Sequence, residues 1–388
     1  MKKNLIPITK PTLDSKEVLE VEKVLKSGWI TQGPKVENFE KDFSKFIGNK
    51  YSIAVSNCTT GLHLALKVAG IKKNDEVITV SHSYIATANS IRYCGAIPVF
   101  VDIDIKTYNI DHGLIEDAIT DKTKAILCVH QMGMPCNISK ILKIAKKHNI
   151  SIIEDAACSI GSEILYNGSW EKIGKPHGDI SCFSFHPRKV LTTGEGGMIT
   201  TGNEYYDKKF RLLRHHGMSV SDLERHNSTN LIFEDHILLG YNYRLTDLQA
   251  AVGVAQLKKI QKIIKVRRKL AKQYFEVLND IDEITLPYEP DWAKSNWQSF
   301  CIRLDDNLNR DDVMEYLKSQ KISTKAGIMC SHLETAYKNE PWRTNSDLFQ
   351  SKRARNQSLL LPIYNDLNYE NQKYIATKLK HILKANNC

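Results

Sequence analysis

One lysine stands out in this sequence because of the residues on either side of it. Lys189 lies between residues 181–185, where hydroxyl groups alternate with apolar side chains, and the glycine-rich stretch 194–197. A lysine amine attacks a carbonyl carbon only when it is unprotonated, and burial or nearby cations lower its pKa toward that state. We therefore predict a Schiff-base lysine at position 189, with a lowered pKa.

Polar residues follow several predicted strands at the point where each strand ends. Short apolar, β-branched runs alternate with helical stretches, and the runs lie at residues 51–55, 76–80, 97–101, 124–129, 151–153 and 179–183. This alternation is typical of a parallel sheet covered by helices on both faces, which binds ligands beyond the C-terminal ends of its strands. Polar residues occur at those ends, at 56–60, 81–84, 130–131, 154–155 and 184–189. We expect the active site at that edge.

Residues 59–66 are predicted to open a helix directly after a strand. The first backbone N–H groups of a helix lack partners and carry the positive end of its dipole, so a phosphate group fits there. Thr59 can equally be interpreted as the N-cap of this helix, with no role in ligand binding.

Asp155 and Tyr84 each have a structural interpretation beside a functional one. Asp155 ends an apolar strand, where a carboxylate is costly to bury unless it meets a cation. That cation is either the protonated ring nitrogen of a ligand or a residue in a structural salt bridge. Tyr84 either stacks on a flat heterocycle or fills the core, and for an isolated tyrosine the core interpretation is favoured. His186, three residues before Lys189, either positions a substrate or is structural.

The length of 388 residues and an apolar content of 42% indicate a globular protein with a large and a small domain. After residue 245, apolar residues at helical spacing predict a long helix reaching Tyr274. Farther along, residues 297–304 predict a strand, and residues 311–318 and 371–385 predict helices. We expect a large domain at residues 1–250 and a smaller C-terminal α/β domain at residues 251–388.

The charge, the termini and the cysteines bear on partners and location. The net charge of +10 favours an acidic partner or a solvated basic surface. Because no nucleic-acid-binding motif is present, a phosphorylated small molecule is favoured over nucleic acid. The N-terminus lacks an apolar run, and no stretch is long enough to span a membrane. The nine cysteines form no CxxC pair. We expect a cytoplasmic protein with reduced thiols, without a bound metal or a membrane partner.

Segments along nearly the whole chain resemble the DegT/DnrJ/EryC1/StrS family of sugar aminotransferases, which use pyridoxal 5'-phosphate (PLP). The matching segments follow the family's order, at residues 27–34, 75–78, 86–89, 95–102, 154–157, 181–198, 214–218 and 240–251. The resemblance implies the α/β type I PLP-dependent transferase fold of the aspartate aminotransferase superfamily. In that fold a mostly parallel seven-stranded sheet, flanked by helices, forms the large domain.

The resemblance also implies roles for individual residues. Lys189 would form the Schiff base, Asp155 would pair with the cofactor's ring nitrogen, and Tyr84 would stack on the ring. The residues implied for the cofactor phosphate are Cys58 through its backbone, Thr59, Ser184 and, from the second subunit of a homodimer, Asn242. The chain departs from the family at Cys158, where glutamine or histidine usually lies near the ring's phenolic oxygen. A thiol donates weakly, so that contact is lost or passes to water.

The implied reaction moves an amino group in two stages, from L-glutamate to the cofactor and then to a keto acceptor, with Lys189 transferring the proton. The family's usual acceptors are nucleotide-linked keto-sugars for glycan biosynthesis. A small phosphorylated ketone or a keto-cyclitol remains the alternative. A sugar dehydratase of the same fold carries histidine in place of the lysine, and Lys189 argues against it. A non-catalytic PLP-fold regulator is the alternative of another class.

Overall fold

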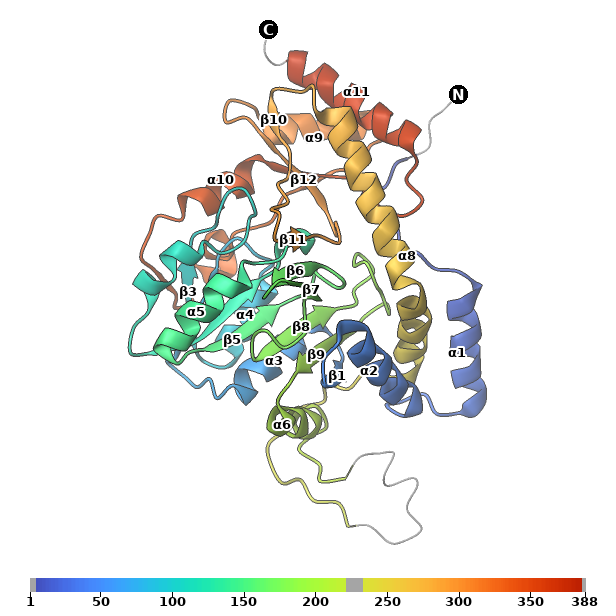
Figure 1. The fold of residues 1–388 in the computed structure, drawn as a ribbon, viewed down its shortest axis with the longest axis vertical. Helices are drawn as coiled ribbons and strands as arrows, with labels where there is room; N and C mark the ends of the chain where they lie inside the picture. Colours follow the sequence, from blue (N-terminus) through green and yellow to red (C-terminus); the bar gives the residue numbers. More distant parts are fainter. Residues whose placement is uncertain (1–4, 221–232, 386–388) are drawn as a thin grey trace.

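The computed structural model describes residues 5–220 and 233–385, and its largest element is an eight-stranded sheet (Figure 1). In spatial order the strands are β1 (Tyr51–Val55), β9 (Gly197–Thr201), β8 (Ile180–Ser184), β5 (Ser151–Asp155), β4 (Thr123–Val129), β2 (Glu76–Val80), β3 (Ile97–Val101) and β14 (Arg343–Thr344). The pairs from β8 to β14 are parallel, whereas β9 is antiparallel to both of its neighbours. The sheet is therefore mostly parallel, as predicted.

The six strands predicted in the first half of the chain are all confirmed, and two further strands complete the sheet. Strand β9 begins at Gly197, the last residue of the glycine-rich stretch 194–197. Strand β14 places Arg343 and Thr344 beside Val99 and Phe100 at the sheet edge. The sheet thus has eight strands where the family resemblance implied seven, and the two residues of β14 are too few to show an alternation in the sequence.

Helices flank this sheet and bury its apolar side chains in a first core (Figure 1). They are α2 (Pro34–Ile47), α3 (Cys58–Val68), α4 (Ala86–Tyr93), α5 (Ile138–His148) and α6 (Glu204–Arg214). Helix α1 (Ser15–Ser27) lies instead against α8 (Asp247–Leu278), as Figure 1 shows. Helix α2 shows the packing, since Phe43 lies against Phe183 and Phe39 against Phe185, with ring centroids 5.2 and 5.3 Å apart. The expected α/β architecture is confirmed.

The C-terminal part of the chain forms a second core around a four-stranded sheet. Its strands are, in spatial order, β10 (Ile284–Thr285), β12 (Phe300–Leu304), β15 (Ser358–Leu361) and β13 (Lys325–Ala326). Its helices are α9 (Arg310–Ser319) and α11 (Tyr369–Ala385), and α10 (Phe349–Gln357) precedes β15. The predicted strand at 297–304 and both predicted helices are confirmed, with the strand beginning at Phe300.

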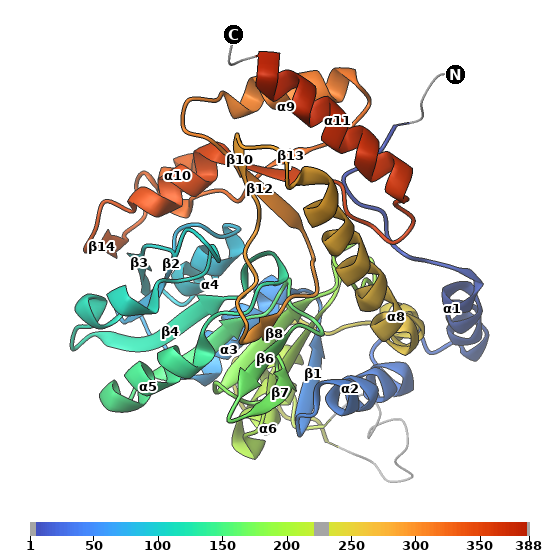
Figure 2. The same cartoon turned by 45° about the horizontal axis from the view of Figure 1, so that its top comes forward.

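Helix α8 (Asp247–Leu278) joins the two cores, as Figure 2 shows. Its N-terminal part, which includes Ile260 and Ile263, contributes to the first core, and its C-terminal part contributes Leu270 and Tyr274 to the second. The predicted boundary at residue 250 falls in the first turn of this helix. The division into domains at that residue stays a prediction.

Smaller elements connect the two parts. A three-stranded sheet combines β11 (Ala293–Lys294) with the hairpin of β6 (Glu163–Tyr166) and β7 (Ser169–Lys172). Short 3-10 helices lie at His112–Leu114, Glu116–Ala118, Gln131–Gly133, Ser331–Leu333 and Thr335–Tyr337. Among the described helices, none combines the length and apolar character needed to cross a membrane.

Candidate active site

Three strands bring the candidate residues to one edge of the large sheet. Because β9 runs opposite to both β1 and β8, these two strands run in the same direction, and β5 is parallel to β8. Their C-terminal ends therefore share an edge. Helix α3 follows β1 there, Asp155 ends β5, and the loop carrying Lys189 follows β8.

Lys189 reaches from its loop to the loop that follows β5. The ammonium Nζ donates to the Cys158 sulfur at 3.0 Å, and the Lys189 backbone N–H donates to the His186 carbonyl at 2.8 Å. Burial lowers the pKa of Lys189, but Cys158, with smaller contributions from Cys58 and Asp155, outweighs burial and raises that pKa above its ordinary value. The expected lowering is wrong for the chain described here, because these neighbours favour the charged amine.

Asp155 is buried, with 5% of its surface exposed, and its two oxygens accept different hydrogen bonds. Oδ2 accepts from the Thr87 hydroxyl at 2.7 Å, and Oδ1 accepts from the Ala157 backbone N–H at 3.1 Å. Burial raises the pKa of this carboxyl although both bonds oppose the change. No ion pair to Asp155 occurs within the described ranges, so the structural salt-bridge interpretation is wrong there.

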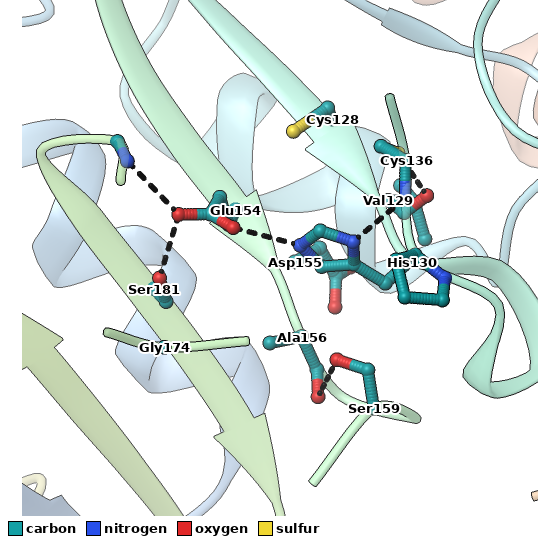
Figure 3. A network of polar contacts seen from close by, with 12 residues as sticks. Cys128, Val129, His130, Cys136, Glu154, Asp155, Ala156, Ser159, Gly174 and Ser181 are labelled. Carbon is teal, nitrogen blue, oxygen red and sulfur yellow. Dashed lines mark hydrogen bonds and ion pairs between the residues drawn. The ribbon is translucent and has the colours of Figure 1, made fainter. Parts of the chain in front are cut away.

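The residue before Asp155 points to the opposite side of the strand and belongs to a buried network (Figure 3). Glu154 accepts from His130 Nε2 at 2.9 Å and from the Ser181 hydroxyl at 3.0 Å. His130 Nδ1 in turn accepts from the Cys136 backbone N–H at 3.0 Å, so Nε2 carries the proton that binds Glu154. His130 and Glu154 are completely buried. They therefore lie on the side of β5 away from the Asp155 carboxylate. The sequence had placed both residues among the candidate active-site groups.

The N-cap side chain of α3 binds the backbone N–H of Thr60, and the N–H groups of Cys58 and Thr59 remain for a ligand. Asn57, not Thr59, is the N-cap, and its side chain accepts from the Thr60 backbone N–H at 2.9 Å. The interpretation of Thr59 as the cap is therefore wrong. The Cys58 thiol turns to the Cys182 carbonyl at 3.6 Å, which leaves its backbone for other contacts. The backbone N–H groups of Cys58 and Thr59 lie in the first turn of α3, where a helix favours anions.

Strand β9 connects Ser184 with the N-terminus of α3, because it contacts both. Ser184 pairs with Gly197 in the sheet, and a Cβ atom on Gly197 would come within 2.8 Å of the Cys58 nitrogen. The structure thus brings Cys58, Thr59 and Ser184 together, as the sequence predicted. Whether they hold a phosphate stays a prediction.

Tyr84 and Asn242 lie on the surface of the chain. Tyr84 is 68% exposed, so the core interpretation of this residue is wrong. Its carbonyl accepts from the Thr87 backbone N–H at 3.1 Å, which places Tyr84 one turn from the residue that binds Asp155. Asn242 is exposed, and its Oδ1 accepts from Arg244 at 3.1 Å. Among the described residues, no bond joins Asn242 to another candidate residue, and its role across subunits stays a prediction.

Two residues near the site were not found from the sequence. Thr87 binds Asp155, and only its helical position one turn after Tyr84 could have indicated it. Lys325 comes from β13 in the C-terminal part, more than a hundred residues after Lys189. Burial, together with the charges of Arg188 and Lys189, lowers the pKa of Lys325. These three cations therefore belong to one electrostatic neighbourhood.

The groups at this edge fit the expected cofactor. A buried carboxylate that no described cation contacts suits a protonated ring nitrogen, an open helix N-terminus suits a phosphate, and a lysine amine suits an aldehyde. Within the described residues, no group of three or more His, Cys, Asp or Glu side chains could hold a metal ion. The residues present therefore match PLP in its three reactive or charged parts.

Comparison with known proteins agrees with this chemistry. The model of the DegT/DnrJ/EryC1/StrS aminotransferase family matches residues 11–380. The spore coat polysaccharide biosynthesis protein SpsC of Bacillus subtilis is 34% identical, and the match covers 98% of each chain.

Solved structures with the same fold are also found. The aminotransferase PseC of Helicobacter pylori, involved in the biosynthesis of pseudoaminic acid, is 27% identical, with a TM-score of 0.89 and coverage of 98% and 100% of the two chains. The putative sugar aminotransferase Spr1654 of Streptococcus pneumoniae, in its PLP form, is 26% identical, with a TM-score of 0.89 and 98% of each chain covered.

Proposed function

Because the chain belongs to the DegT/DnrJ/EryC1/StrS aminotransferase family, we propose that it transfers an amino group from L-glutamate to a nucleotide-linked keto-sugar. It is a PLP-dependent sugar aminotransferase with a small-molecule amino donor and acceptor. The observation that supports the proposal most is the position of Lys189. Its amine contacts Cys158 and lies in the electrostatic reach of Asp155, at the edge where parallel strands bind ligands.

Each residue at this edge has a definite task in the proposal. When bound, PLP supplies an aldehyde that accepts the donor's nitrogen and a ring that delocalises negative charge. Asp155 keeps the ring nitrogen protonated, because a cation beside this buried carboxylate lowers the cost of its burial. Cys58 and Thr59, with Ser184, would bind the phosphate, and Tyr84 would stack on the ring.

Lys189 acts twice in the proposed reaction. Its Nζ would hold the cofactor and, as a free amine, would move a proton to or from the substrate carbon. Only an unprotonated amine can do either. A positive ring nitrogen beside Asp155 offsets one of the negative groups that now raise the Lys189 pKa.

The cations around Lys189 support an anionic acceptor. Arg188 and Lys325 add two positive charges to the same neighbourhood, and the chain as a whole carries a net charge of +10. The diphosphate of a nucleotide-linked sugar matches this charge, as does a smaller phosphorylated ketone. Relatives named for polysaccharide and pseudoaminic acid biosynthesis support the sugar.

We also propose a cytoplasmic homodimer with shared active sites. Three apolar side chains shortly before Asn242 are largely exposed, which is typical of a surface that a partner covers; they are Phe233, Ile237 and Leu239. A second subunit there would also bring Asn242 to the partner's cofactor. The eight described cysteines are free thiols, which supports a reducing compartment.

Reduction of the purified holoenzyme with sodium borohydride tests the assignment of Lys189. We expect loss of a visible absorbance band and a cofactor adduct on the peptide containing Lys189, detected by mass spectrometry. Lys189→Ala should fold normally, yet form no pyridoxamine phosphate with glutamate in a single turnover. Lys106→Ala, at an exposed position, is the matched control and should behave as the wild type.

An adduct on another lysine, or normal single-turnover chemistry in Lys189→Ala, would refute the catalytic assignment.

The acceptor is tested separately, by 2-oxoglutarate release with UDP-, dTDP- and GDP-linked keto-sugars and with small phosphorylated ketones or keto-cyclitols. Turnover with a small ketone alone would refute the nucleotide sugar and leave the aminotransferase intact.

A further inference from the structure

A short segment of the C-terminal part reaches into the active site without supplying a catalytic group. Residues 295–299 lead directly into β12 of the second core. Within them, Trp297 is buried and has a φ of 53°, a backbone conformation that a bulky residue adopts only when its surroundings enforce it. Such strain often marks a functional position, so the contacts of this segment are informative.

Gln298 holds the main chain on both sides of Lys189. Its Oε1 accepts from the Val190 backbone N–H at 2.9 Å, and its Nε2 donates to the Arg188 carbonyl at 2.6 Å. These two groups belong to the peptide units immediately before and after Lys189. One amide side chain therefore restrains the backbone from which the catalytic lysine extends.

Asn296 holds the loop that carries Cys158. Its Nδ2 donates to the carbonyls of Cys158 and Ile160, both at 2.9 Å, and its Oδ1 accepts from the Gln298 backbone N–H at 2.8 Å. The two loops whose side chains meet at the Lys189–Cys158 contact are thus bound by residues two positions apart. Their relative position depends on this segment.

The segment is itself fixed to α8. Arg267, which is buried in that helix, donates through Nη1 to the carbonyls of Trp297 and Gln298 at 3.0 and 3.4 Å. The Ser299 backbone N–H donates to the Met132 carbonyl at 3.3 Å. The restraint on Lys189 therefore begins in the helix that joins the two cores.

We propose that Gln298 is a positioning residue for Lys189, and that Asn296 aligns the Cys158 loop with it. The proposal rests on the proposed function, because it assumes that the Lys189 amine reacts. With the flanking peptides held, the lysine side chain starts from one backbone orientation, and its amine is presented to the reacting carbon in one direction. Without these hydrogen bonds the amine is still present, but its direction toward the reacting carbon is no longer fixed.

The test compares Gln298→Met with Gln372→Met in the purified holoenzyme. Methionine keeps the length and approximate shape of glutamine but forms neither hydrogen bond. Gln372 is a matched control, because it is a completely buried glutamine that donates to the Leu270 carbonyl at 2.8 Å in the second core. Both variants lose side-chain hydrogen bonds to the main chain, but only the Gln298 bonds flank Lys189.

We expect Gln298→Met to lower the single-turnover rate with glutamate by roughly 10- to 100-fold, the cost typical of a misplaced catalytic group. The glutamate concentration at half-maximal rate should change by less than about threefold, because binding groups are untouched. The pH midpoint of the visible cofactor band should shift, since the direction of the Lys189 nitrogen changes. Gln372→Met should lower the melting temperature and alter neither the rate nor the band.

If Gln298→Met fails to fold, Gln298→Glu carries the same test, because it accepts from Val190 N–H but cannot donate to the Arg188 carbonyl. A rate and band in the Gln298 variant equal to those of Gln372→Met would overturn the positioning role. This outcome is distinguishable from failure of the proposed function, in which the wild-type protein itself shows no borohydride adduct on Lys189.

Discussion

At the scale of single residues, the site owes its character to two groups that the rest of the chain leaves incompletely satisfied. Asp155 is a buried carboxylate whose pKa is raised by burial, with no ion pair among the described residues. Lys189 is a partly buried amine whose closest polar partner is a thiol. Both arrangements are costly in an isolated chain, and both become favourable when a flat cofactor with a cationic nitrogen and an aldehyde is bound.

The Lys189–Cys158 contact leads to a pH prediction. Cys158 raises the pKa of Lys189, so its removal lowers that pKa, and the amine is deprotonated at a lower pH. We expect the rate of PLP attachment to apo Cys158→Ala to rise with pH as in the wild type, with the profile displaced to lower pH. Absorbance stopped-flow between pH 6 and 10 measures it. The apo Cys94→Ala variant, which removes a buried thiol from α4's C-terminus, is the control and should keep the wild-type profile.

A profile for Cys158→Ala that coincided with the wild type, or moved to higher pH, would contradict this account of the contact. The sign is fixed by the physical cause, because a group that favours the charged amine can only raise its pKa.

At the scale of elements, the candidate phosphate site depends on how closely β9 approaches α3. Gly197 starts β9, pairs with Ser184 on one side and Val55 on the other, and lies against the first turn of α3. Glycine permits this approach because it has no Cβ atom. The serine hydroxyl and the helix terminus are thereby brought close enough to bind one anion.

Gly197→Ala tests this packing. Its Cβ would come within 2.7 Å of the Asn57 carbonyl carbon and 2.8 Å of the Cys58 nitrogen, so main-chain atoms must separate. We expect a loss of about 1–3 kcal/mol in the free energy of unfolding, typical of overpacking. PLP should bind more weakly, as measured by fluorescence titration of the apoprotein.

Gly61→Ala, in the helix α3 against which Gly197 lies, is the matched control. Its Cβ would come nearest to the Ile199 and Val55 side chains, both at 3.4 Å, and to the Cys182 sulfur at 3.7 Å, all ordinary contacts. Alanine also favours a helix interior by roughly 0.5–1 kcal/mol over glycine. The variant should therefore bind PLP as the wild type does. Equal PLP affinity in Gly197→Ala would show that the close approach of β9 is not needed for the phosphate.

At the scale of the whole molecule, residues from both ends of the chain meet at one edge of the large sheet. Helix α8 runs through both cores, and residues 295–299 return from the second core to the loops of Lys189 and Cys158. Lys325 adds a cation from β13. The C-terminal part thus contributes alignment and charge to a site whose reactive groups come from the N-terminal part.

The proposed homodimer is the property of the whole molecule that is simplest to test. Leu239 is 90% exposed, three residues before Asn242. Leu239→Asp would place a charge in the proposed interface, and we expect the dissociation constant of the dimer to rise at least about tenfold, since burying an unpaired charge is costly. Light scattering measures the assembly, and the same variant should retain PLP less well because the partner's Asn242 is lost.

Leu114→Asp, at a position where leucine is 40% exposed in another part of the chain, serves as the control and should stay dimeric. A wild-type protein that remained monomeric at all concentrations while catalysing the reaction would contradict the shared active site.

The sequence by itself determined the reactive groups and the elements that carry them. Lys189 follows one apolar strand and Asp155 ends another. Strand patterns are local and parallel strands end at a common edge, so the sequence alone predicts that both residues lie there. Only the tertiary structure decided which polar neighbours join them. Glu154 and Asp155 are adjacent in sequence yet face opposite sides of the sheet, and Gln298 binds main-chain groups 108 to 110 residues away. Contacts between residues so distant leave no periodic pattern, so folding alone brings them into register.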